Sequence, residues 1–135
     1  MALELVVVTP SGEALSQEIE QVVLPGEAGD FGVLESHERF LTPLQRGPMQ
    51  IISSKGTEWA ALSSGFAEVD GSRVVVLVDA CVMADEVDHA ATETRRAEAA
   101  DALAALAPGE ESAGERARLE LVVARAELEL DVSRR

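Results

Sequence analysis

Short apolar segments alternate with turn residues through the first 84 positions of the chain. A β-branched run over residues 3–8, for example, ends at Thr9-Pro10-Ser11-Gly12. The intervals between such runs are too short for intervening helices, so the pattern predicts strands joined by tight turns, with hairpins at Lys55-Gly56 and Asp70-Gly71. The predicted strands are residues 3–8, 19–24, 31–34, 49–53, 58–62, 66–69 and 73–78.

Many short strands with two apolar faces to bury predict a β-sandwich or flattened barrel for this part of the chain. Pro43 and Pro48 are expected at sheet edges or bends, because proline cannot donate a hydrogen bond to a β-ladder. Composition changes near residue 85, since eight of the ten glycines precede it. The chain is therefore expected to form two domains, residues 1–84 and residues 85–135.

In the second domain the apolar period changes from two to about 3.6, which is typical of helices. Asp85 is the predicted N-cap of a helix over residues 86–106, which stops at Pro108-Gly109. Ser112 and Glu115 have the spacing of a capping box that opens a second helix to Val132. The short loop predicts an antiparallel hairpin, so the expected fold class is α+β, an N-terminal β-sandwich followed by a C-terminal two-helix hairpin.

The net charge of the chain disfavours some classes of binding partner. The chain has 11 Lys and Arg against 25 Asp and Glu, for a net charge of −14, so its field repels nucleic acid and anionic lipid. The longest apolar run, Val74–Val78, is far too short for a membrane span, and direct lipid insertion is not expected. Residues 1–8 lack a basic region and are expected to be a first strand, not a signal or transit peptide.

No catalytic or metal-binding constellation emerges from the sequence. His37 and His89 fall in different predicted domains, and the single Cys81 is interpreted as a buried strand hydrophobe. No acid, base and nucleophile converge, so an enzyme is the least favoured class, and no metal or cofactor is expected. The glycine-rich segment at residues 25–32 lacks the lysine of a phosphate loop. From the residues alone, that segment is either an acidic contact loop or a solvated turn.

The apolar and glycine-rich segments, taken in order, resemble the epsilon subunit of the F-type rotary ATP synthase. The resemblance covers the whole chain, since that family pairs an N-terminal β-sandwich with a C-terminal two-helix hairpin. It is carried by Leu24–Leu34, His37, Leu41–Leu44, Gly47, Ser64–Val69 and Val74–Asp79.

The resemblance implies a non-catalytic rotor subunit in the central stalk. It would link the gamma subunit to the membrane c-ring and couple proton transport to ATP synthesis, at the cytoplasmic face of a bacterial inner membrane. The family's acidic c-ring contact corresponds here to Asp30, with Glu27, Gly29, Phe31 and His37 as neighbouring candidates. The alpha/beta catalytic hexamer is a further partner implied for the hairpin.

Some members of the family bind ATP through an Ile/Leu-Asp-x-x-Arg-Ala motif. Here the segment reads Val87-Asp88-His89-Ala90-Ala91-Thr92, which keeps Asp88 but replaces the arginine with Ala91. The guanidinium is lost, so weak or absent ATP binding is predicted. The hairpin carries 13 acidic and 7 basic residues, which favours a packing clasp with a weak effect on hydrolysis. The alternative function is a free-standing acidic β-sandwich binding module with a helical lid.

Overall fold

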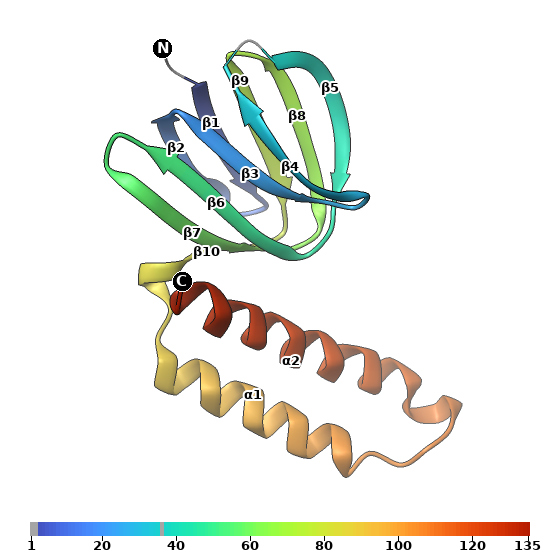
Figure 1. Ribbon diagram of the computed structural model, residues 1–135. Coiled ribbons are helices and arrows are strands. Elements are labelled where there is room, and N and C mark those ends of the chain that lie inside the picture. The colour runs from blue at the N-terminus through green and yellow to red at the C-terminus, as the bar shows by residue number, and fades with distance from the viewer. Residues whose placement is uncertain (1–2, 36) are drawn as a thin grey trace.

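The computed structural model describes residues 3–35 and 37–135, without the side chains of His37 and Glu38. Ten strands precede two helices (Figure 1). The strands are β1 Leu3–Thr9, β2 Gly12–Ile19, β3 Gln21–Gly26, β4 Gly29–Leu34, β5 His37–Leu44, β6 Gly47–Ser53, β7 Gly56–Leu62, β8 Gly65–Gly71, β9 Arg73–Val78 and β10 Cys81–Met83. The helices are α1 His89–Ala104 and α2 Ala113–Ser133, preceded by single 3₁₀ turns at Ala84–Glu86 and Glu110–Ser112.

The strands pair in the order β10-β7-β6-β3-β5-β8-β9-β1-β2, and β4 pairs with β3. The sheet wraps around one core, as a sandwich close to a closed barrel (Figure 1). Val74, Val76 and Val78 show the underlying period of two, because all three point inward and are buried. The predicted β-sandwich is confirmed. Its largest fully buried side chains include Leu3, Leu5, Leu24, Leu44, Met49, Ile51 and Leu62.

Three strands were missed by the sequence pattern: β2, β5 and β10. The predicted strand at residues 19–24 in fact joins the end of β2 to most of β3. β2 pairs only with β1 and exposes most of its side chains, so its apolar alternation is weak. Pro43 and Pro48 lie where the ladder is one-sided: β3 pairs with β5 only at Leu44, and with β6 only at residues 50–52.

The predicted start of the first helix is wrong, and the second helix starts where predicted but without its capping box. Asp88, not Asp85, is the N-cap of α1, and its Oδ1 accepts a hydrogen bond from the Ala91 amide at 3.1 Å. Asp85 lies in the preceding 3₁₀ turn. Ser112 does occupy the N-cap of α2, but its side chain makes no capping bond. Glu115 pairs with Arg118 instead, so the predicted capping box is absent.

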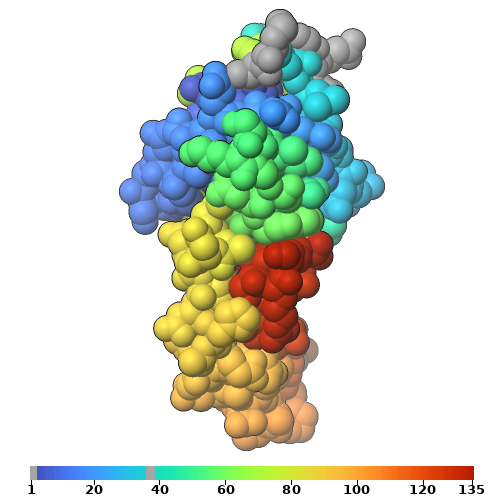
Figure 2. Space-filling view, turned by 60° about the vertical axis from the view of Figure 1, so that its left-hand side comes forward, coloured from blue at the N-terminus to red at the C-terminus, as the bar shows by residue number. Residues whose placement is uncertain are grey.

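The helices form the predicted antiparallel hairpin, and α2 is the helix that lies against the sandwich (Figure 1). Two polar contacts set their register. Arg95 pairs with Glu129 at 3.0 Å, and the His89 ring lies 2.6 Å from the Ser133 hydroxyl. Figure 2 shows the end of α2 and the start of the hairpin side by side beneath the strands. The last turns of α2 therefore attach the whole hairpin to the sandwich.

Candidate functional site

The β3–β4 hairpin carries the predicted acidic contact loop. Gly26 pairs with Gly29, so Glu27 and Ala28 form the turn, and Gly29 takes a φ of 129° that favours glycine. The Glu27 amide donates to the Pro43 carbonyl at 3.1 Å, and the Gln45 amide donates to the Pro25 carbonyl at 2.9 Å. These bonds fix the tip of the hairpin to the end of β5.

The acidic side chains at this tip are available to a partner. Glu27 and Asp30 are both exposed, and neither carboxylate accepts a hydrogen bond from a residue that the structure describes. Phe31 instead turns inward and packs edge-on against Phe40, with ring centroids 5.7 Å apart. The backbone of His37 pairs with Gly71, but its side chain lies outside the described residues. Of the predicted contact residues, Asp30, Glu27 and Gly29 share the exposed tip.

A second surface was not predicted from the sequence. Leu41, Phe66 and Leu77 are 66%, 51% and 44% exposed, on β5, β8 and β9. Phe66 is the cross-strand partner of both Pro43 and Leu77, so these side chains form one apolar strip. We call Leu41, Pro43, Phe66 and Leu77 the apolar strip. In the sequence, the Val74–Val78 run was the one indication of this surface, because it is apolar on both faces of its strand.

A shallow concavity of about 440 Å³ borders the apolar strip. Pro10 and Val8 approach it from the end of β1, beside Phe66 and Leu77. Exposed apolar side chains that adjoin a hollow are typical of a protein interface. The strip and the acidic tip meet at Pro43, whose ring lies in the strip and whose carbonyl anchors Glu27. The two surfaces are therefore continuous.

The remnant of the nucleotide motif has a structural use in this chain. Asp88 caps α1, and its bond goes to the amide of Ala91, the position where the motif has arginine. Thr92, the last residue of the segment, is buried in the hairpin. Capping of α1 is therefore a sufficient structural role for Asp88, without a bound nucleotide.

Cys81 provides a test of how β10 packs. It is half-buried against the core, and burial, together with the nearby Glu86 carboxylate, raises the pKa of its thiol to about 11. The thiolate is the reactive form, so we expect slow alkylation at pH 8 in the folded chain and fast alkylation in urea. Mass spectrometry after a timed iodoacetamide pulse measures both rates, and equal rates would contradict this packing.

The same shift links stability to pH. The folded-state pKa lies above the ordinary value of 9.0, so between pH 9 and about 11 the unfolded chain loses a proton that the folded chain keeps. The free energy of unfolding should therefore fall as pH rises through this window. Urea titrations of the parent chain and of Cys81→Ser at pH 8 and pH 11 isolate the effect, because the variant lacks the thiol.

Known proteins are similar to this chain over nearly its whole length. Residues 2–84 match the family model described as ATP synthase, Delta/Epsilon chain, beta-sandwich domain. The chain is 35% identical over 128 residues to the ATP synthase epsilon chain of Geotalea uraniireducens, covering 90% of this chain and 93% of that relative. It is 34% identical over 134 residues to the epsilon chain of Herpetosiphon aurantiacus, covering 99% and 96%. The chain belongs to the delta/epsilon chain family of ATP synthase.

Two solved structures that share this fold contain chains of mitochondrial ATP synthases. A chain of the Euglena gracilis mitochondrial ATP synthase, from an OSCP/F1/c-ring structure, aligns with a TM-score of 0.66 at 20% identity, covering 98% of this chain and 78% of that one. A chain from the central stalk/c-ring of Tetrahymena thermophila mitochondrial ATP synthase gives 0.58 at 11% identity, covering 98% and 97%. The predicted resemblance to the epsilon family is confirmed.

Membership in the family makes this chain a subunit of a membrane-associated complex. No helix in the described residues is long and apolar enough to cross a bilayer. The described residues also hold no group of three or more His, Cys, Asp or Glu side chains arranged for a metal ion.

Proposed function

We propose that this chain is a non-catalytic rotor subunit that joins the gamma subunit to the c-ring, on the cytoplasmic face of a bacterial inner membrane. It transmits torque between proton transport and ATP synthesis without carrying out chemistry itself. The observation that carries the proposal is the apolar strip beside the acidic tip, two surfaces of different chemistry that share Pro43. A stalk subunit needs two such adjacent surfaces, one for each partner.

The apolar strip is the surface proposed for gamma. Burial of apolar area drives most protein association, and aromatic side chains are prominent among the residues that contribute most. Phe66 lies at the middle of the strip, between Pro43 on one neighbouring strand and Leu77 on the other. The sheet beneath these residues is continuous, so the strip presents a firm surface that loses little conformational entropy on binding.

The acidic tip is the surface proposed for the c-ring, with Asp30 and Glu27 facing basic or amide groups on the ring loops. An exposed ion pair contributes only about 0–1 kcal/mol, so the tip orients the subunit more than it holds it. Its two backbone bonds to the end of β5 keep the carboxylates in place during rotation. Affinity then comes chiefly from the apolar strip.

Phe66→Glu is the decisive test of this proposal. A charge at the centre of the strip would be desolvated in the complex, so we expect the affinity for a gamma-containing stalk to fall by about 10- to 100-fold. Leu34→Glu is the matched control, because Leu34 is 56% exposed on β4, away from the strip. Binding is measured by surface plasmon resonance with the purified full chain. Equal loss of affinity in both variants would refute the assignment of the strip.

For the hairpin, residues 85–135, we propose a packing role with weak control of hydrolysis and little or no ATP binding. Asp88 serves as a helix cap, and Ala91 offers only its backbone amide. Calorimetric titration of the full chain with Mg-ATP should give no saturable heat at micromolar concentrations. The variant Ala91→Arg, which carries the arginine of the motif, is the comparison. Micromolar affinity for Mg-ATP in the parent chain would overturn this expectation.

A further inference from the structure

Two acidic residues flank the apolar strip on its own face of the sandwich. Glu68 lies on β8, two residues from Phe66, so both side chains project from the same side of the strand. Asp79 follows the end of β9, two residues beyond Leu77, and lines the same shallow concavity as Phe66 and Leu77. Both acidic residues are exposed. The apolar centre of this face therefore lies between two carboxylates.

The strand register sets the separation of the two acids. Glu68 is the cross-strand partner of Val75, and Asp79 comes four residues after Val75 in the chain. At about 3.3 Å per residue, the two positions are roughly 13 Å apart along the strands. The cross-strand pair of Phe66 and Leu77 lies midway between them. A partner segment that covers this apolar pair therefore comes close to both carboxylates.

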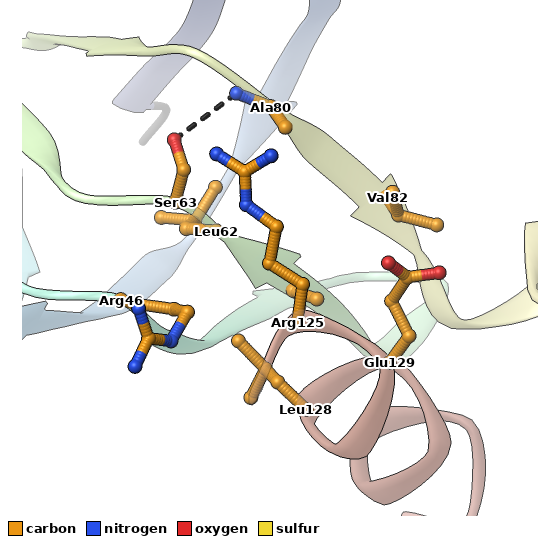
Figure 3. A pocket seen from close by; sticks show the side chains of 9 residues that line it. Arg46, Leu62, Ser63, Ala80, Val82, Arg125, Leu128 and Glu129 are labelled. Carbon is orange, nitrogen blue, oxygen red and sulfur yellow. Dashed lines mark hydrogen bonds between the residues drawn. The ribbon is translucent and has the colours of Figure 1, made fainter. Parts of the chain in front are cut away.

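Backbone hydrogen bonds hold Asp79 at the rim of the concavity. The hydroxyl of the buried Ser63 accepts from the Asp79 and Ala80 amides at 2.8 and 3.0 Å. The second of these bonds is the dashed line between Ser63 and Ala80 in Figure 3. The Ala80 carbonyl in turn accepts from the Ser63 amide at 3.0 Å. The chain therefore leaves β9 in a fixed direction, and the position of Asp79 beside the apolar strip is fixed with it.

Neither of these two carboxylates pairs with a cation among the residues that the structure describes. The neighbouring charges on this face already have partners. Arg39 binds Asp70 at 3.1 Å, and Arg73 binds Glu4 at 3.0 Å. Asp70 is the cross-strand partner of Arg73, so these charges form one row across the strands, beyond Glu68 on the side away from the strip. The two acids that flank the strip are thus left available for a cation from outside the chain.

We propose that the partner segment that covers the apolar strip carries two cationic side chains about 13 Å apart, which pair with Glu68 and Asp79. An apolar side chain between the two cations enters the concavity beside Phe66. Contact at the strip removes water from both carboxylates, and a desolvated carboxylate that gains no partner is costly. An uncharged or acidic segment would therefore bind poorly, and the two acids act as specificity determinants of the strip.

This inference rests on the proposed role of the apolar strip as the surface for gamma, and it adds the chemistry of the segment that gamma supplies. Complementary charge beside an apolar contact speeds association and disfavours wrong partners more than it adds affinity. The net charge of −14 attracts a cationic segment from a distance, but it is spread over the whole chain. The two fixed acids give that attraction a position, and so select the register in which the segment docks.

Surface plasmon resonance of the full chain on a gamma-containing stalk, at low and at physiological ionic strength, tests the inference. We expect the double variant Glu68→Gln/Asp79→Asn to bind about 10- to 50-fold more weakly at low salt, chiefly through slower association. The affinity of the parent should fall as salt rises, and that of the double variant should fall much less. Glu120→Gln is the matched control, because it removes one charge at an exposed position of α2. It should keep the parent affinity within about twofold.

Phe66→Glu, measured in the same experiment, separates this inference from the proposal on which it rests. If Phe66→Glu weakens binding but the double variant keeps the affinity and salt dependence of its parent, the strip stands as the surface for gamma and the pairing with cations is wrong. If Phe66→Glu also binds like the parent, both proposals fail. A loss in Glu120→Gln equal to that in Glu68→Gln would show an effect of net charge alone, and would overturn the paired contacts. Thermal unfolding should give the parent Tm for all of the charge-removing variants, because these side chains are exposed.

Discussion

Replacing Gly65 with alanine is expected to destabilise the sandwich by about 3 kcal/mol or more, a change at the high end for a single residue. An added Cβ would lie 2.0 Å from the Leu77 carbonyl oxygen and 2.9 Å from Val78 Cγ1. The first of these atoms is backbone within the β8–β9 ladder, so it cannot move aside without breaking the pairing. Urea unfolding followed by the fluorescence of Trp59, the single tryptophan, measures the loss.

Gly114→Ala is the control for this substitution. Gly114 lies in α2, and a Cβ there meets nothing within 4 Å. Alanine favours the helix, so the control should be neutral or stabilising by up to about 1 kcal/mol. If Gly65→Ala unfolded at the same urea concentration as its parent, the close approach of β8 and β9 at this point would be wrong.

Val132→Asp is expected to detach the hairpin while the sandwich stays folded. Val132 is 0% exposed in the last turn of α2, and a carboxylate buried there would cost several kcal/mol, roughly 3 or more. The Arg135 guanidinium lies over the Trp59 ring, 4.5 Å from its centroid, so detachment should change the tryptophan emission. Limited proteolysis between the sandwich and α1 gives a second measurement.

Leu121→Asp matches this change on the exposed side of the same helix, where Leu121 is 39% exposed. It should leave both the emission and the proteolysis pattern unaltered. The pair also tests the clasp role in the assembled enzyme, where detachment by Val132→Asp should change ATP hydrolysis by less than about twofold, well under 1 kcal/mol in activation free energy. A large rise in hydrolysis would show that the hairpin is an inhibitor.

Strands with a buried and an exposed face were predictable because the core alone fixes their alternation. Val74, Val76 and Val78 all face inward, and the predicted strand 73–78 matches β9. The missed strand β5 carries Pro43 and a register shift between His37 and Phe40, so its pattern is irregular. Its pairing with β8, far along the chain, holds it in the sheet. Tertiary pairing therefore overrides the local signal.

Helix starts were harder to predict because several acidic residues compete for one cap. Glu86 accepts a hydrogen bond from the Met83 amide at 2.9 Å, which stabilises a separate 3₁₀ turn around Asp85. The helix proper then begins after Asp88. Which acidic residue caps the helix therefore depends on a side-chain hydrogen bond, and the spacing of residues in the sequence does not reveal that bond.

The candidate site was predictable only in part. The acidic tip follows from a glycine turn with flanking acids, which is a local pattern. The apolar strip depends on which face of β8 and β9 the core covers, so Phe66 and Leu77 could not be distinguished from core residues by type alone.

The parallel pairing of β1 with β9 has a consequence for synthesis. Glu4 is matched with Arg73 and Val8 with Leu77, so the first strand made must wait for nearly the last strand of the sandwich before its ladder is complete. Distant pairings of this kind slow folding, and a chain emerging from the ribosome cannot complete β1 until about 70 further residues have been translated. Until then β1 pairs only with β2, and its other edge, including the β-branched Val6–Val8 segment, stays open to intermolecular association.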